Sequence, residues 1–199
     1  MPATATATTT ALRPMGTGTS SRRAAVALLT LGLAGCGGSS ATSSFAWLRP
    51  QPPPSGWKVL TIPSGARLAY PPTWRALHGD PGTATVAFRT PAGRFLGYLN
   101  LTPRQGAETL SNWATFRTEH NAEEGDRRVR RLASAEHLRF RSGQGSCVKD
   151  SYTTITAARY VEIACLVRGV GASFVIVGAA PPDAWGQVSP VIERAIASV

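Results

Sequence analysis

Runs of apolar or alternating residues, separated by turns that contain proline or glycine, follow one another along most of the chain after residue 57. Runs of this length and pattern predict β-strands. We expect strands at residues 58–62, 66–70, 83–89, 95–101, 129–133, 138–141, 146–155, 159–167 and 172–178. Residues 172–178 are almost entirely apolar, as in a strand covered on both faces, so we expect this strand at the centre of a sheet.

Short connections indicate that neighbouring strands pair as hairpins. Pro63-Ser64-Gly65 separates the first two strands, and residues 91–93 separate the next pair. A tight loop around Thr156 joins residues 146–155 to residues 159–167. Because such turns connect antiparallel strands, the sheet is predicted to be mostly antiparallel.

Two segments change to a helical period. Residues 107–124 are followed by Gly125, which is placed to end a helix. The apolar stripe of the C-terminal tail consists of Trp185, Val188, Ile192, Ile196 and Val199. We expect a kink in the tail, where Ser189 would cap a second segment that begins at Pro190. The prediction is therefore an α+β fold, a mostly antiparallel sheet packed with an internal helix and a C-terminal helix.

The N-terminal region has the pattern of an export signal. Arg22 and Arg23 precede the apolar run 24–33, which is too short to span the ~30 Å hydrocarbon core of a bilayer. The run ends in Leu33-Ala34-Gly35-Cys36, which resembles a bacterial lipobox. We expect residues 1–35 to be a lipoprotein signal peptide, cleaved between Gly35 and Cys36, with Cys36 carrying the lipid. Met15 is an alternative start, and the general and twin-arginine export routes both stay open.

Residues 36–56 have the composition of a tether, first rich in serine and glycine and then in proline. Phe45 and Trp47 are its apolar exceptions, and they would either dip into the membrane interface or dock on the domain. The domain itself is expected at residues 57–199, a length that allows one core but not two. The predicted location is the cell membrane, lipid-anchored on the extracytoplasmic face.

Charge narrows the range of partners. Three of the 21 basic residues, Arg13, Arg22 and Arg23, lie in the signal, so 18 basic residues face 11 acidic ones after cleavage and the formal charge falls from +10 to +7. A basic domain tethered at a membrane favours anionic lipids or acidic wall polymers, and it argues against nucleic acid as a partner.

The densest charge is Arg127-Arg128-Val129-Arg130-Arg131. A strand here would carry arginine on both faces, which suits an exposed edge or a loop, where charge also discourages aggregation. Two interpretations stay open, a solvated edge and an anion-binding patch formed by Arg127, Arg128, Arg130 and Arg131.

Three cysteines are present, and lipidation of Cys36 would leave an even pair in an oxidising compartment. A hairpin in which Thr154 lies opposite Ala158 places Cys147 opposite Cys165, seven residues further out on each strand. We therefore predict a disulfide between Cys147 and Cys165; the alternative is two buried free thiols.

Candidate chemistry is sparse. The histidines His78, His120 and His137 are scattered, and no metal-binding spacing connects them. Residues 143–147 lack the spacing of a nucleophile loop. Asp150, Glu162 and the pair Glu123-Glu124 offer carboxylates that the sequence does not bring together. No catalytic residue, metal or cofactor is predicted, so we expect a protein that is not an enzyme.

A family resemblance follows from three features. They are the stop Tyr70-Pro71-Pro72-Thr73-Trp74 after the first hairpin, the apolar strand ending at residues 178–182, and the final amphipathic helix. In this order they resemble the PsbP-like fold, most closely the actinobacterial lipoproteins of the LpqN/LpqT kind. The excess of arginine over lysine agrees with such a source. The resemblance implies a domain that docks other proteins and has no catalytic residue.

The predicted function is that of a non-catalytic interaction module at the cell envelope, with an envelope protein as its partner. The alternative is a carrier or sensor of a lipid or cell-wall-derived ligand. Such a carrier would need an apolar cavity, and its candidate lining residues are Trp57, Trp74, Trp113 and Trp185.

Overall fold

The apolar strand β9 (Ser173–Ala180) lies in the middle of a seven-stranded antiparallel sheet, as its composition predicts. The computed structural model describes residues 43–199. The strand order is β3-β4-β5-β9-β8-β7-β6. The other strands are β3 (Arg75–Leu77), β4 (Ala84–Arg89), β5 (Phe95–Pro103), β6 (Arg127–Arg139), β7 (Gly143–Thr153) and β8 (Arg159–Gly169). The predicted α+β fold is confirmed.

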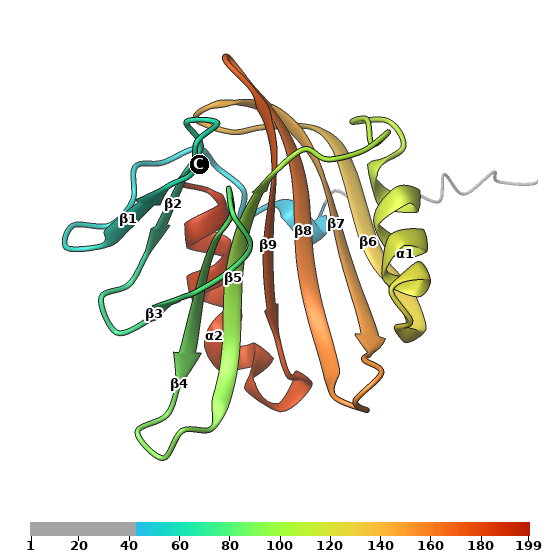
Figure 1. Ribbon diagram of the computed structural model, residues 1–199. Coiled ribbons are helices and arrows are strands. Elements are labelled where there is room, and N and C mark those ends of the chain that lie inside the picture. The colour runs from blue at the N-terminus through green and yellow to red at the C-terminus, as the bar shows by residue number, and fades with distance from the viewer. Residues whose placement is uncertain (1–42) are drawn as a thin grey trace, which may run out of the picture. The chain divides into compact units, whose positions relative to one another are not determined.

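One helix packs on each face of this sheet (Figure 1). The first, α1 (Trp113–Glu123), lies against β6, β7 and β8, and the second, α2 (Pro182–Ile196), lies against β5, β8 and β9. Alternation along each strand sends one set of side chains to each helix. Ile163, Cys165 and Ile176 face α2, whereas Val148, Ala164 and Val177 face α1.

The first hairpin forms as predicted. Strands β1 (Lys58–Thr61) and β2 (Arg67–Tyr70) pair antiparallel as a separate two-stranded sheet. Gly65 closes the turn with a φ of 86°, a left-handed conformation that glycine adopts without strain. Leu68 and Tyr70 of β2 are buried in the same core as α2, so this hairpin covers part of that core.

Helix α1 begins later than the spacing predicts. The side chains of Thr109 and Asn112 bond the backbone instead: Thr109 N–H donates to Asn112 Oδ1 at 2.6 Å, and Asn112 N–H donates to Thr109 Oγ1 at 3.2 Å. These bonds hold residues 109–112 as turns and delay the helix to Trp113. At the other end Gly125, with a φ of 92°, ends the helix as predicted.

Helix α2 runs through Pro190, and the predicted second segment beginning at Pro190, with Ser189 as its cap, is wrong. Proline removes one backbone donor, which costs the helix one hydrogen bond. Buried residues stand on both sides of it, Val188 before and Ile192 and Ile196 after, and all pack on one core. Tertiary packing therefore holds the helix together across the proline.

Strand β6 replaces the two short strands predicted at residues 129–133 and 138–141. Three register shifts interrupt its pairing with β7, and Arg128 and His137 adopt positive φ within them. Bulges insert extra residues without ending a strand, which removes the alternating pattern that would have identified β6 in the sequence. The sequence also gave no indication of β3, which is only three residues long.

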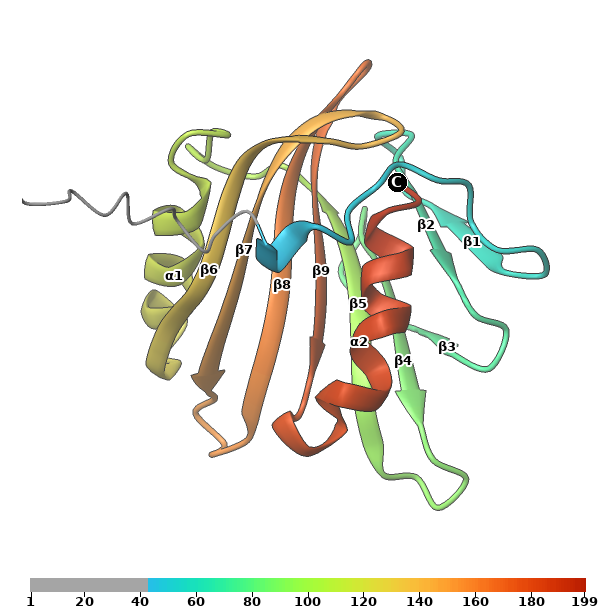
Figure 2. The same ribbon diagram turned by 180° about the vertical axis from the view of Figure 1, so that it is seen from behind.

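The segment predicted as a tether packs on the domain from residue 43 onward. Phe45, at the end of the 3₁₀-helix η1 (Ser43–Phe45), is 3% exposed and belongs to the α2-side core, and Trp47 and Leu48 pack against it. Gln51 N–H donates to Ala197 O at 3.1 Å, and Arg194 Nη2 donates to Pro52 O at 3.3 Å. Figure 2 shows this segment crossing the α2 side of the sheet. The described domain therefore begins before Trp57, because apolar side chains in the proline-rich stretch supply core contacts.

Candidate functional site

The four clustered arginines lie on the outer edge of the sheet. Strand β6 is the last strand in the order, and all four side chains are exposed. Arg130 pairs with Ser151 and Arg131 with Asp150, neighbours on β7 that point to opposite faces, so this edge carries arginine on both faces. None of the four takes part in an ion pair within residues 43–199. The edge placement agrees with the sequence interpretation, whereas anion binding stays a prediction.

The docked N-terminal segment contacts β6, the strand that carries the four arginines, through η1. Phe45 fixes the segment in the core, as described above. The signal peptide, the lipobox and Cys36 lie outside the described residues. Neither helix among residues 43–199 is long and apolar enough to cross a membrane.

Cys147 and Cys165 form the predicted disulfide, and their Cα atoms are 4.1 Å apart. The register of β7 and β8 pairs them directly, and Thr154 N–H donates to Ala158 O at 2.8 Å across the turn. Cys147 lies an odd number of residues from Thr154, so the cysteines occupy a pair without backbone hydrogen bonds, where opposed side chains are closest. Both cysteines are buried in the α2-side core, which gives the disulfide a structural role.

A buried polar cluster lies between α1 and the sheet. Arg117 of α1 forms two bonds with Glu162 of β8: Nε donates to Oε1 at 2.7 Å and Nη2 donates to Oε2 at 3.0 Å. Tyr152 OH donates to Glu162 Oε2 at 3.1 Å. Asp150 lies directly opposite Glu162 in the register of β7 and β8, and neither carboxylate is exposed to solvent. The structure thus joins Asp150 and Glu162, which the sequence left apart.

Only one of the two buried carboxylates, that of Glu162, is bonded to the Arg117 guanidinium. Neither carboxylate oxygen of Asp150 has a hydrogen-bond partner within residues 43–199. Burial, followed by the charge of Glu162, raises the pKa of Asp150 to about 8, so this carboxyl binds a proton at neutral pH. Burial also opposes the charge of Arg117, but Glu162 more than offsets that effect and raises the pKa of the guanidinium. The cluster is a satisfied ion pair beside a protonated acid.

An open groove lies between α1 and β5 on the same face of the sheet. Two adjoining cavities of about 260 and 410 Å³ form it. Both are lined by Thr102, Gln105, Arg117, His120 and Val175, so they are parts of one groove, here called the α1–β5 groove. It exists because α1 covers β6 to β8 and leaves β4, β5 and β9 without a helix on this face.

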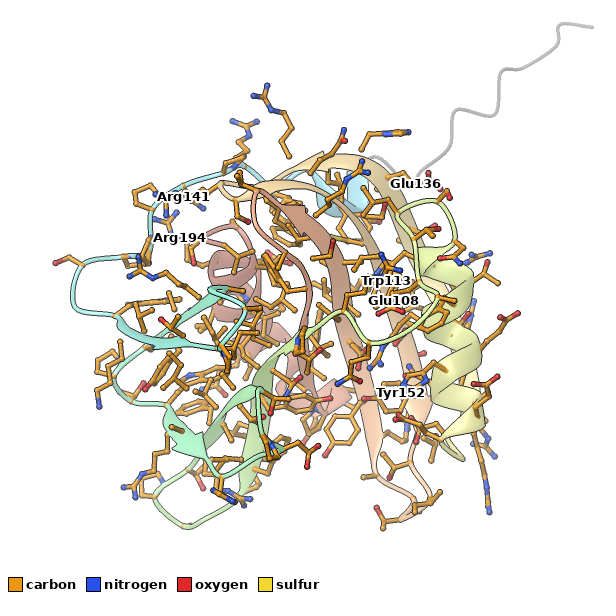
Figure 3. All side chains as sticks on the ribbon, turned by 45° about the horizontal axis from the view of Figure 1, so that its top comes forward. Glu108, Trp113, Glu136, Arg141, Tyr152 and Arg194 are labelled. Atoms are coloured by element: carbon orange, nitrogen blue, oxygen red, sulfur yellow. A yellow bond between two sulfur atoms is a disulfide. The ribbon has the colours of Figure 1, made fainter. Side chains whose placement is uncertain are left out.

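Glu108 is the unusual residue of the α1–β5 groove. It is 3% exposed, and its Oε1 accepts from the Gln105 N–H at 2.9 Å, but its Oε2 has no partner within residues 43–199. Figure 3 shows Glu108 beside Trp113, near the start of α1. Trp113 Nε1 donates to Ala164 O at 2.9 Å and is therefore already bonded. The groove thus presents a buried acceptor that the protein itself does not satisfy.

The other residues singled out in the sequence are dispersed. Trp74 stacks on Phe88 in the α2-side core, whereas Trp113 lies on the opposite face of the sheet. None of the four cavities found along residues 43–199 is lined by two of the predicted tryptophans. His120 lies in the groove and pairs with Glu124 at 3.2 Å. No group of three or more His, Cys, Asp or Glu side chains arranged for a metal ion occurs in the described part of the chain.

Sequence reasoning missed the ion pair between Arg117 and Glu162 and the role of Glu108. One sign was available: Glu162 interrupts the otherwise apolar run of residues 161–167, and a carboxylate in a buried strand needs a partner. Arg117 follows Trp113 by four residues, which places both on one face of a helix. Glu108 gave no such sign, because its segment was expected to be helical.

Comparison with known proteins places the fold. No family model matches the chain, and no curated protein matches it. Among solved structures, the chain is similar to cyanobacterial PsbP (CyanoP) from Synechocystis sp. PCC 6803, with a TM-score of 0.50 and 15% identity over 73% of this chain and 92% of that one. This likeness shows a PsbP-like fold, which the sequence resemblance predicted.

Two further similarities are weaker. One is to PA94 from Pseudomonas aeruginosa, a protein of unknown function described as a putative regulator, with a TM-score of 0.47 and 11% identity over 73% of this chain and 96% of that one. The other is to LpqN of Mycobacterium tuberculosis, described as involved in cell envelope biogenesis, with a TM-score of 0.38 and 13% identity over 74% of this chain and 79% of that one. At these scores neither carries an argument about this chain.

Proposed function

We propose that the protein is a lipid-anchored, extracytoplasmic binding module whose arginine edge lies against an anionic membrane surface. The observation that carries the proposal is the docking of the N-terminal segment beside β6. Seven residues after Cys36 the chain reaches Ser43, and seven extended residues span at most about 25 Å. A lipid on Cys36 would therefore keep β6 close to the bilayer.

The arginines of β6 suit this position. Basic side chains near an anionic leaflet contribute about 1 kcal/mol each to binding, and the attraction falls off within a Debye length. Arg127, Arg128, Arg130 and Arg131 are exposed and without ion pairs within residues 43–199, so their charge is available to headgroups. The anchor and the edge would act together, since one acyl chain alone binds weakly.

A binding role rather than a catalytic one is supported by how the carboxylates are used. Glu162 is held by Arg117 and Tyr152, and Asp150 is enclosed beneath α1, so neither faces a cleft. The proposed partners are the membrane and a further protein of the envelope. The lipobox pattern and the arginine-rich composition support an actinobacterial lipoprotein of this kind.

The test is binding of the unlipidated chain, residues 37–199, to vesicles with and without anionic lipid. We expect changing Arg127, Arg128, Arg130 and Arg131 together to Gln to weaken binding to anionic vesicles at least about tenfold. A charge-matched control changes four exposed arginines elsewhere, Arg67, Arg75, Arg104 and Arg168, to Gln and should lose much less. Equal losses in both variants would mean that net charge, not the β6 edge, binds the membrane.

A further inference from the structure

The α1–β5 groove has several hydroxyl and amide side chains among its lining residues. Thr85, Asn100, Thr102 and Gln105 contribute four of them, and Asn100 Nδ2 donates to Thr85 Oγ1 at 2.7 Å. That bond fixes the amide and leaves its Oδ1 as an acceptor. We propose that this groove binds a neutral, hydroxyl-rich saccharide. The proposal does not rest on the lipid anchor or on the arginine edge.

The charges around the groove disfavour an anionic ligand. Arg117 is the only guanidinium in the lining of either cavity, and two bonds to Glu162 already neutralise it. His120 is paired with Glu124. Glu108 and Asp80 add negative charge with no cation to offset it among the ion pairs of residues 43–199. A phosphate or carboxylate ligand would therefore meet repulsion rather than attraction.

The backbone around the groove disfavours a peptide that adds as a strand. Strand addition needs an unpaired strand edge. The groove lies over β5 and β9, which are paired with neighbours on both sides, and the open edges of the sheet are β3 and β6. A ligand here cannot extend the sheet, so its recognition depends chiefly on side chains. A row of hydroxyls matches that requirement, because each hydroxyl both donates and accepts.

Glu108 supplies a hydrogen-bond acceptor that indicates a ligand site. Its Oε2 is buried without a partner, and a hydroxyl of a bound sugar would satisfy it. Gly106 lines the same cavity and carries no side chain over that oxygen; a Cβ at this position would lie 2.9 Å from Oε2.

Aromatic rings supply the apolar part of the site. Phe116 and His120 of α1 stack with centroids 5.9 Å apart and planes 13° apart, and both are partly exposed. Tyr98 lies on the wall formed by β5. The C–H face of a pyranose ring packs on such rings while its hydroxyls reach the polar side chains around them. A lipid chain could pack on these rings, but it would leave the hydroxyl, amide and carboxylate groups of the groove without partners.

The test is calorimetric titration of the full chain, kept in a detergent without a sugar headgroup, with chitotetraose, cellotetraose and maltotetraose. We expect saturable binding of at least one of them. Glu108→Gln removes the charged acceptor without changing its shape and should weaken that binding about tenfold or more. Asn100→Ala should weaken it as well, and Gly106→Ala should weaken it by placing a Cβ against Oε2.

The matched control is Glu136→Gln, the same change at an exposed residue of β6, which should leave the affinity unchanged. Two results would overturn the proposal. One is the absence of saturable binding for all three oligosaccharides. The other is binding that Glu108→Gln and Asn100→Ala leave intact, which would place the sugar elsewhere on the protein.

Discussion

Burial of Asp150 makes the stability of this fold depend on pH. Glu162 on β8 and Arg131 on β6 lie opposite Asp150 in the sheet. The charges of Arg117 on α1 and of Asp126 also act on its carboxyl group. Only Arg117 is close enough to Glu162 to form an ion pair, and Asp150 is left with two unbonded oxygens among the described residues. The fold therefore accommodates Asp150 as a neutral acid.

This environment predicts that stability falls as pH rises. The carboxyl has a pKa of about 8 in the folded chain and an ordinary value of 3.8 when unfolded, so between these values the folded state binds more protons. The free energy of unfolding should fall by up to about 1.4 kcal/mol per pH unit across that window and level off above it. Asp150→Asn should remove most of the fall and stabilise the protein at pH 7. Urea unfolding at several pH values between 5 and 9 measures this.

The control is Glu136→Gln, which removes an exposed carboxylate and should leave the pH dependence as in the unaltered protein. If Asp150→Asn and the unaltered protein lost stability in parallel between pH 5 and 8, Asp150 would not be the group that binds the proton.

At the scale of elements, close packing of α2 on the sheet depends on Gly178. A Cβ at this position in β9 would overlap Cγ2 of Ile192 and lie 3.1 Å from Cδ2 of Leu99, both in fully buried side chains. Gly178→Ala should therefore destabilise the protein by about 1–3 kcal/mol. Gly186→Ala is the matched control: Gly186 is exposed on α2 with open space around it, and the change should stabilise by about 0.5–1 kcal/mol. Thermal unfolding that ranked the two variants in the opposite order would refute this packing.

The disulfide joins β7 to β8 across a separation of 18 residues. Replacing Cys147 and Cys165 together with Ala should cost about 2–4 kcal/mol, mainly because the unfolded chain regains freedom. Denaturant unfolding measures the loss. The bond itself is checked by mass spectrometry of exported, non-reduced protein: alkylation of both thiols in native material would rule out the disulfide.

Elements with a regular pattern could be predicted, and elements with an interrupted one could not. The hairpin of β7 and β8 was predicted down to its register, because a two-cysteine constraint and a short loop define the pairing. Strand β6 was predicted as two pieces, because three bulges break the period of two that identifies a strand. The docking of residues 43–56 was left open, since Phe45 and Trp47 stand in a proline-rich stretch that carries no periodic pattern.

The groove could not be predicted from the sequence for a different reason. Its walls come from β5, α1 and the loop before α1, and Arg117, which lines it, forms an ion pair with a residue 45 positions away. Such contacts depend on how the helix crosses the sheet, which no local pattern encodes. The arginine edge, by contrast, was visible because charge on both faces of a strand is tolerated only at an edge.

At the scale of the whole molecule, the proposed anchor, the docked segment and the arginine edge form one arrangement. The docked segment contacts β6 through η1, and β6 carries the four arginines. Two or more acyl chains at roughly 0.8 kcal/mol per buried methylene would hold the protein firmly, and the edge would then orient it.

The most direct test of this account is the intact mass of the protein purified from membranes of the producing cells. We expect a chain that begins at Cys36 and carries the added mass of acyl groups on that residue. A mature chain that retains residues before Cys36, or one whose Cys36 is unmodified, would contradict the account.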